Sequence, residues 1–210
     1  MNITFSDAEV KDLFVAWLAL GVAFTLFLER DIRMALLGDI AGLTVGGVVS
    51  VLAVSLLTVG VGFLLHELAH KVVAVRFGQL AAFKADYRML GFAIIGGLAG
   101  FLFAAPGAVV HRGRITEREG GLIALAGPVT NLALAVVFLV PFVFALLSGI
   151  RGFLWEVARM GVQINLLLAG FNMIPFGPLD GRKVREWSTL VFLVVAVPSI
   201  LLGLGALFVL

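Results

Sequence analysis

Two histidines and a glutamate lie within five consecutive residues of a hydrophobic stretch of the sequence. His66 and His70 are four residues apart, so on a helix their side chains share one face and are close enough to bind one metal ion. Glu67 lies between them and can act as a general base on a water molecule that the metal activates. Ionisable groups inside an apolar segment cost about 3 kcal/mol each in lipid and therefore indicate a functional site. The pattern predicts metal-dependent hydrolysis.

A catalytic zinc site usually has three protein ligands and a water, so two histidines leave one ligand to find. The chain has no cysteine, and its third histidine, His111, lies among arginines in a stretch that we interpret as a loop. The third ligand is therefore expected to be a carboxylate. Two acidic residues away from the ends of the hydrophobic segments are candidates, Glu156 and Asp180.

The two carboxylates have different surroundings in the sequence. Glu156 comes three residues before Arg159, and on a helix this spacing favours an ion pair. Asp180 follows Pro175 and Pro178, which prevent a continuous helix and can direct a carboxylate back toward the histidines. Asp180 can equally cap a helix that starts a few residues later. Asp180 is the favoured ligand and Glu156 the alternative.

The composition places these residues in a membrane protein. Of 210 residues, 61% are hydrophobic and 13% charged, against about 25% charged in soluble domains. The mean hydropathy is +1.14. This length accommodates about five to six transmembrane helices of about 20 residues and no sizeable soluble domain. We expect an all-α polytopic membrane fold that forms a single domain over residues 1–210, with no PDZ or CBS domain.

The hydrophobic segments predict where the helices lie. Five are expected to cross the bilayer, at residues 13–28, 42–77, 121–147, 153–174 and 189–210. The second would be about 54 Å long as one helix, against a bilayer core of about 30 Å, so it must tilt, break or start later, for example at Gly46 and Gly47. Residues 92–106 are short and glycine-rich, which favours a re-entrant or interfacial segment.

The distribution of basic residues favours one orientation. If the N-terminus is cytoplasmic and residues 92–106 do not cross, three basic residues lie outside: Arg30, Arg33 and Arg151. Eleven lie on the cytoplasmic side: Lys11, Lys71, Arg76, Lys84, Arg88, Arg112, Arg114, Arg118, Arg182, Lys183 and Arg185. The positive-inside rule supports this topology. It places His66, His70 and Asp180 near the cytoplasmic face.

Three motifs resemble those of the site-2 protease family of intramembrane zinc metalloproteases. They are the His-Glu-Leu-Ala-His sequence at residues 66–70, Gly127-Pro128 followed by Asn131, and residues 172–181, which end in Leu-Asp-Gly. Their order and spacing match over about residues 46–185. We interpret Asn131 as an interhelical hydrogen-bonding residue.

The resemblance implies one Zn²⁺ per chain, with His66, His70 and Asp180 as ligands and Glu67 as the residue that activates water. It also implies that Asn172 helps to bind or polarise the scissile carbonyl. Membrane-associated strands that engage substrate are implied between the histidines and Gly127.

The expected function is intramembrane proteolysis. The partners are a membrane protein substrate, cut in or beside a helix-destabilised transmembrane segment, and the lipid bilayer; nucleic acid is not expected. Two alternatives remain open at this point. One is a membrane zinc protease with a glutamate as third ligand, for which Glu156 is the candidate. The other is a membrane protein that binds metal without catalysis.

Overall fold

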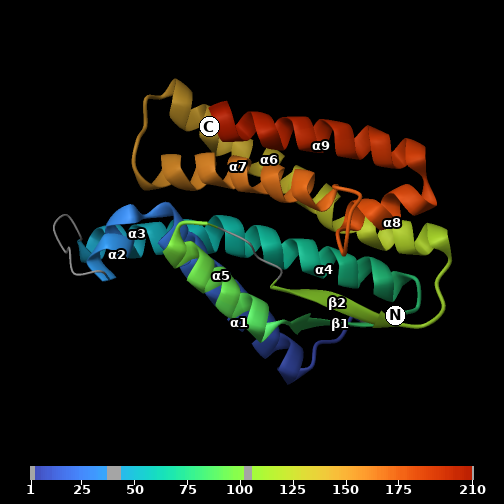
Figure 1. The fold of residues 1–210 in the computed structure, drawn as a ribbon. Coiled ribbons are helices and arrows are strands. Elements are labelled where there is room, and N and C mark those ends of the chain that lie inside the picture. The colour runs from blue at the N-terminus through green and yellow to red at the C-terminus, as the bar shows by residue number, and fades with distance from the viewer. Residues whose placement is uncertain (1–2, 37–43, 102–105, 210) are drawn as a thin grey trace.

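The chain is largely helical in a computed structural model, which describes residues 3–36, 44–101 and 106–209. The elements run in the order α1 (Asp7–Leu28), α2 (Arg30–Leu36), α3 (Val45–Ser55), the π-helical turn η1 (Leu56–Gly60), α4 (Val61–Arg76), β1 (Leu80–Ala85), α5 (Tyr87–Ala99), β2 (Gly107–Arg112), α6 (Glu117–Leu147), α7 (Phe153–Asn172), α8 (Asp180–Trp187) and α9 (Thr189–Val209) (Figure 1).

Four helices in the described part of the chain are long and apolar enough to cross a membrane. They cover Asp7–Leu28, Val45–Arg76, Glu117–Leu147 and Thr189–Phe208. Helix α5 is apolar but has only 13 residues, a length of about 20 Å. The prediction of a helical, multi-pass membrane protein is confirmed. The two-stranded sheet adds a β element to the expected all-α fold.

The second span is one long helix with a π turn in its middle. It begins at Val45, where the Thr44 hydroxyl accepts a hydrogen bond from the Gly47 amide, so it starts later than the full hydrophobic stretch, as one of our expectations had it. Residues 37–43 lie outside the described part. The π turn rearranges the main-chain hydrogen bonds over Leu56–Gly60, and the Trp17 indole N–H donates to the Leu56 carbonyl oxygen at 3.1 Å.

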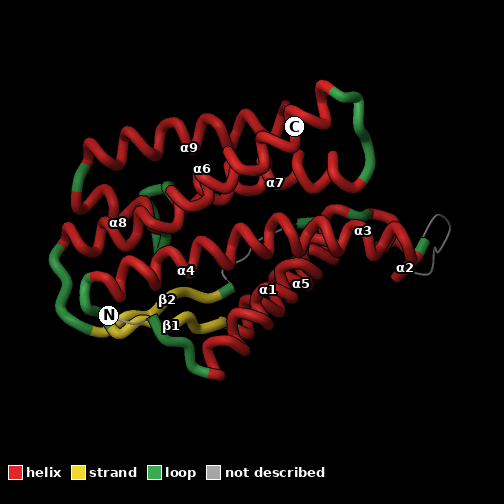
Figure 2. The backbone as a smooth tube through the Cα atoms, turned by 180° about the vertical axis from the view of Figure 1, so that it is seen from behind, coloured by secondary structure: helices red, strands yellow, loops and turns green. Residues whose placement is uncertain are grey.

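Helix α4 lies between two groups of elements. On one side it contacts α6, which packs with α7 and α8, and α9 in turn packs on α7 and α8. On the other side it contacts the sheet, which packs against α1, and α5 in turn packs on α1 (Figure 2). Because α4 is covered on both sides, its polar residues are shielded by protein rather than exposed to lipid.

The strands β1 and β2 form an antiparallel pair in which Ala85 faces Gly107. The Asp86 amide also donates to the Pro106 carbonyl oxygen at 3.0 Å. The segment between the strands, which includes α5, therefore leaves the sheet and returns to the same end of it. Residues 102–105 of the expected re-entrant segment are outside the described part. The strands that the family resemblance implies thus flank that segment.

Helix α8 follows the proline-containing break and starts at Asp180 itself, not a few residues after it. Gly177 has a φ of +61°, which a glycine adopts without strain. Gly181 lies against the end of α7, where an added Cβ would be 2.2 Å from the Met173 carbonyl oxygen. The close contact fixes the start of α8 on α7. It therefore fixes the position of Asp180.

Candidate metal centre

The middle of α4 carries His66, Glu67 and His70, and all three side chains are buried. The two imidazole rings lie 4.6 Å apart between centroids and nearly perpendicular to each other. This is the shared helix face that the four-residue spacing predicts.

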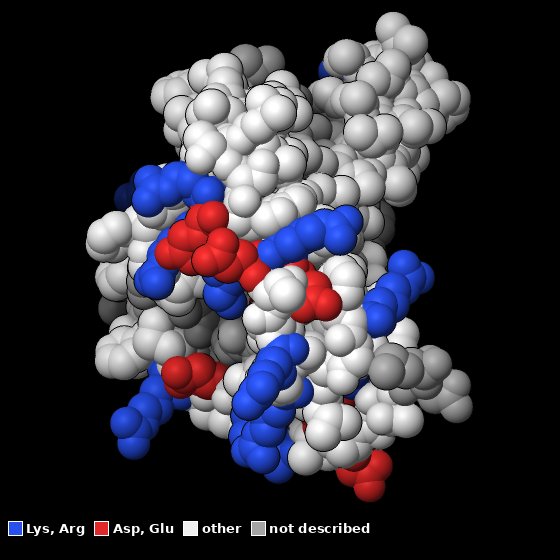
Figure 3. Space-filling model, turned by 90° about the vertical axis from the view of Figure 1, so that its right-hand side faces the viewer, with Lys and Arg blue, Asp and Glu red and all other residues white. Residues whose placement is uncertain are grey.

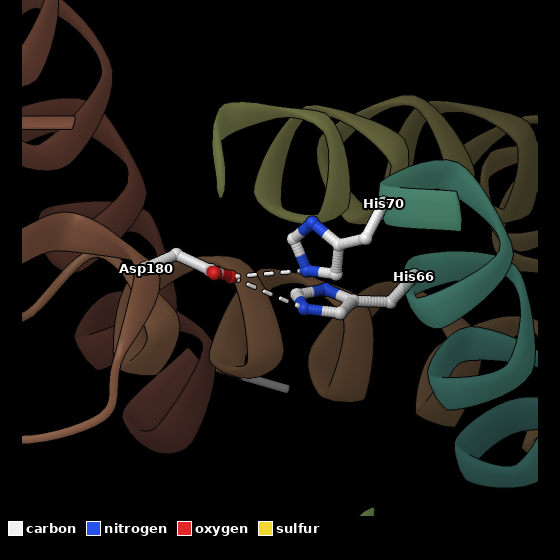
Figure 4. A group of neighbouring side chains, drawn as sticks. All are labelled: His66, His70 and Asp180. Carbon is white, nitrogen blue, oxygen red and sulfur yellow. Dashed lines mark ion pairs between the residues drawn. The ribbon is translucent and has the colours of Figure 1, made fainter. Parts of the chain in front are cut away.

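Asp180 comes to the two histidines from α8 (Figure 4). Its Oδ2 atom is 3.3 Å from the Nε2 atoms of both His66 and His70. The candidate ligand atoms of these three residues all lie within 4.8 Å of one another. Among the described residues, this is the one group of histidine and acidic side chains with that geometry.

The other nitrogen of each imidazole ring is held by an acceptor on α6. His66 Nδ1 lies 2.6 Å from Asn131 Oδ1, and His70 Nδ1 lies 2.7 Å from the Ile123 carbonyl oxygen. A carbonyl oxygen can only accept, so each Nδ1 carries the hydrogen and each Nε2 lone pair points toward Asp180. Such outer partners are what orient metal-binding histidines.

Asn131 is itself fixed in orientation. It is fully buried, and its amide group donates to the Gly62 carbonyl oxygen at 3.1 Å and to Asn165 Oδ1 at 2.9 Å. Its interpretation as an interhelical hydrogen-bonding residue is correct but incomplete, because it also orients His66. The signal in the sequence was its position four residues after Gly127, one turn along the helix.

The residues present fit a zinc ion. Two ligands held about 2.0–2.2 Å from a tetrahedral zinc are about 3.4 Å apart, close to the 3.3 Å measured from Asp180 Oδ2 to each Nε2. Asp180 Oδ2 is buried and has no hydrogen-bond donor among the described residues. Gly127 leaves the necessary space, since a Cβ there would lie 2.5 Å from both Nε2 atoms.

The charge state of Asp180 also suits a ligand. Burial would raise the pKa of this carboxyl group, but the neighbouring His66 and His70 side chains lower its pKa to about 2. The group is therefore a carboxylate at neutral pH, which is the form that binds metal.

Glu67 contacts the sheet. Its Oε2 atom accepts a hydrogen bond from the Val109 amide of β2 at 3.0 Å. No described residue donates to its Oε1 atom. One carboxylate oxygen is therefore held by the protein, and the other is available to a water molecule.

The remaining polar candidates lie apart from this group. The interpretation of His111 as a loop residue is wrong: it pairs with Ala81 in the sheet, a contact between strands that local sequence does not reveal. Its Nδ1 is buried without a hydrogen-bond partner in the described part of the chain, and burial lowers its pKa, with smaller effects from Lys183 and His70.

Asn172 and Glu156 both form contacts within α7. Asn172 is the last residue of the helix, and its amide donates to the Leu168 carbonyl oxygen at 2.9 Å. Glu156 forms the expected ion pair with Arg159, with an N–O distance of 2.9 Å. The structure therefore brings Asp180 to the histidines and does not bring Glu156 there.

The protein is a multi-pass helical membrane protein, and its buried centre has two histidines and one aspartate beside a glutamate. This combination is typical of a membrane metalloprotease. Comparison with known proteins agrees. The chain is 44% identical over 153 residues to "Putative zinc metalloprotease MJ0611" of Methanocaldococcus jannaschii, covering 71% of this chain and 78% of that protein. The chain belongs to the site-2 protease family of zinc metalloproteases, and its cofactor is Zn²⁺.

Two further relatives have similar names. "Putative zinc metalloprotease YwhC" of Bacillus subtilis is 35% identical over 145 residues, which are 62% of this chain and 66% of that protein. "Zinc metalloprotease MJ0392" of Methanocaldococcus jannaschii is 29% identical over 135 residues, which are 63% and 33% of the two chains. No family model matches the chain, and no solved structure matches it.

Proposed function

We propose that the chain is an intramembrane protease that cuts transmembrane or juxtamembrane segments of other membrane proteins. The observation that carries the proposal is the buried group of His66, His70 and Asp180 with Glu67 beside it, on a helix long and apolar enough to span a bilayer. A site for metal binding alone would not need the glutamate.

In the proposed mechanism His66, His70 and Asp180 hold the zinc. When bound, zinc polarises the scissile carbonyl and lowers the pKa of water. Glu67 accepts a proton from the attacking water on its free carboxylate oxygen as the new carbon–oxygen bond forms. It then delivers that proton to the amide nitrogen as the carbon–nitrogen bond breaks, which releases an amine and a carboxylic acid.

Asn172 is proposed to donate a hydrogen bond to the oxygen of the scissile carbonyl as negative charge develops there. Its amide now donates to Leu168 of its own helix. The role therefore requires this local bond to be exchanged for one to the substrate.

The proposed topology has five crossings, with the metal centre near the cytoplasmic face. Five residues, Ser148–Gly152, join α6 to α7, so α7 must return to the end of the molecule at which α6 begins. Ile123 near the start of α6 and Asp180 just after α7 both contact His70, in agreement with this return. Together with α1, the span Val45–Arg76 and α9, helices α6 and α7 then all cross.

The return of the chain from Ala85 to Gly107 supports a segment that does not cross. Lys and Arg side chains gather at the end of the molecule where α8 and the sheet lie (Figure 3). By the positive-inside rule this end is cytoplasmic. Water would reach the site from there.

The substrate is expected to be a membrane protein whose transmembrane helix unwinds easily. A helix keeps its carbonyls in internal hydrogen bonds, so a carbonyl must be freed before it can be attacked. Gly, Pro, Ser or Asn near the cut lowers the cost of unwinding.

The test is cleavage of a model transmembrane substrate by the purified chain and by its Glu67→Gln variant. We expect the variant to keep one zinc per chain and to lose cleavage by at least about 100-fold, the contribution of a general base. Glu156→Gln is the matched control and should cut like wild type. A Glu67→Gln variant that cuts at the wild-type rate would refute the mechanism. Zinc binding without cleavage of any substrate by the wild type would favour a metal-binding protein that is not an enzyme.

A further inference from the structure

The two outer edges of the sheet are held by two glutamates at the same pair of facing residues. Phe83 and Val109 are register partners. The Phe83 amide donates to Glu9 Oε1 at 3.0 Å, and the Val109 amide donates to Glu67 Oε2 at 3.0 Å. Both N–H groups point out of the sheet, as they do in a non-hydrogen-bonded antiparallel pair. The position of this pair is therefore set from outside, by Glu9 on one edge and Glu67 on the other.

Both glutamates connect the sheet to α4: Glu67 is part of this helix, and Glu9 is bound to Lys71 of the same helix. Lys71 Nζ lies 2.7 Å from Glu9 Oε1 and 2.6 Å from Glu9 Oε2. Lys71 comes four residues after Glu67, so the two side chains leave the same face of α4. The contacts form a closed circuit: Lys71 to Glu9, Glu9 to Phe83, across the sheet to Val109, and from Val109 to Glu67.

The Glu9–Lys71 pair is deeply buried, with Lys71 only 1% exposed and Glu9 only 3% exposed. Lys71 Nζ also donates to the Thr4 carbonyl oxygen at 2.6 Å and lies 3.7 Å from the centre of the Phe5 ring. A buried ion pair is often no more stabilising than an apolar pair of the same volume. Stability alone is therefore a weak explanation for it, and what the pair does to the sheet is the more specific one.

We infer that Glu9, held by Lys71, is a positioning residue for Glu67. Glu9 fixes the Phe83 edge of the sheet. Because Phe83 and Val109 are paired, this also fixes the Val109 N–H, and that N–H holds one oxygen of the Glu67 carboxylate. The inference rests on the proposed function only in that Glu67 is the general base. The contact itself is measurable without substrate.

Two double variants separate the hydrogen bond from the charge. Glu9→Leu with Lys71→Met removes both charges, leaves no unpaired ion and takes the acceptor away from the Phe83 amide. Glu9→Gln with Lys71→Met is also neutral but keeps an acceptor oxygen for that amide. Both carry the same change next to His70, so any difference between them comes from residue 9.

The first readout is hydrogen exchange at single backbone amides in detergent micelles, with zinc bound. We expect exchange at Phe83 and Val109 to be at least about tenfold faster in the Leu variant than in the Gln variant. The Ala85 amide is the internal control, because it donates to Asp12 Oδ2 at 3.1 Å and not to Glu9. Equal exchange at Val109 in the two variants would overturn the inference.

The second readout is cleavage kinetics. The Leu variant should keep its zinc and its KM and lose about tenfold in kcat, part of the contribution of a general base, and the Gln variant should recover most of that loss. If the wild type cuts and the two variants have equal kcat, the inference is refuted and the proposed function is not affected. If the wild type cuts no substrate, the proposed function is refuted instead. The exchange data would then still test whether Glu9 positions the Val109 N–H.

A third variant covers the case in which the Leu variant does not fold. Glu67→Ala removes the acceptor at the other end of the circuit. Exchange at Val109 should rise and, through the facing pair, exchange at Phe83 should rise with it, while Ala85 stays unchanged. Faster exchange at Val109 alone would show that the two edges are independent and would refute the inference.

Discussion

Replacement of Asn131 by leucine should weaken zinc binding strongly, although Asn131 is not itself a ligand. In the native site its side-chain oxygen accepts from His66 Nδ1 at 2.6 Å. Leucine has a similar volume and no acceptor. Without one, the hydrogen of His66 is free to move to Nε2, where it blocks the lone pair that faces Asp180.

The size of the effect follows from the burial of the site. Loss of an outer partner of a metal-binding histidine costs about 10–100-fold in metal affinity. Asn131 is fully buried, so water cannot easily replace its oxygen, and we expect the upper end of that range, about 2.7 kcal/mol. The variant also removes the Asn131 N–H donor from the Gly62 carbonyl oxygen and from Asn165 Oδ1. Each such loss costs about 1–3 kcal/mol of folding free energy.

The assay is a zinc titration of detergent-solubilised protein against a competing chelator, alongside thermal unfolding of the zinc-free protein. Thr130→Val is the matched control, because the Thr130 hydroxyl donates only to the Ala126 carbonyl oxygen of its own helix, at 2.9 Å. The control should bind zinc like wild type. If the folded Asn131→Leu protein binds zinc within about twofold of wild type, the argument that α6 orients His66 is wrong.

Three further changes test other parts of the structure. Gly127→Ala places a methyl group 2.5 Å from both ligand nitrogens and should abolish zinc binding in a chelator titration, whereas Gly120→Ala, whose Cβ makes only one contact at 3.4 Å, should not affect it. Asp180→Asn should lower zinc affinity at least about 100-fold while Glu156→Gln leaves it unchanged, and the reverse result in metal analysis would make the glutamate the ligand. Trp17→Phe removes the hydrogen bond to the π turn and should lower the free energy of unfolding by about 1–3 kcal/mol, without loss of bound zinc in the folded protein.

Local patterns predict the parts of the site that lie on one helix. The shared face of His66 and His70 depends only on the geometry of one helical turn, and the structure shows it. The ion pair of Glu156 with Arg159 is equally local and is also present.

Contacts between distant segments could not be predicted in the same way. The approach of Asp180 depends on how α7 and α8 pack, so the sequence alone favoured Asp180 but left Glu156 open as the alternative. The bond from Asn131 to His66 joins two helices, and the one-turn spacing from Gly127 to Asn131 does not by itself identify His66 as the partner. His111 is an error of the same origin, because its strand exists only through pairing with β1.

The boundaries of the apolar segments were also only partly predictable. Hydropathy suggested a segment starting at residue 92, whereas α5 begins at Tyr87. Its start is polar and is fixed by Asp86, whose side chain accepts from the Arg88 and Met89 amides at 3.0 Å. An N-cap of this kind sets the start of a helix, and here it lies several residues before the hydrophobic stretch begins.

The π turn at Leu56–Gly60 divides the long second span into two halves with different neighbours. A π turn amounts to one residue inserted into an α-helix, and one residue corresponds to a rotation of about 100°. The first half, α3, packs mainly against α1, whereas the second half, α4, packs mainly against α6 and the sheet. Deletion of a single residue here would restore a regular helix that could satisfy only one set of neighbours. A change in the length of this span would therefore move His66 relative to α6 and the sheet, so the number of residues between Val45 and His66 sets the position of the metal centre.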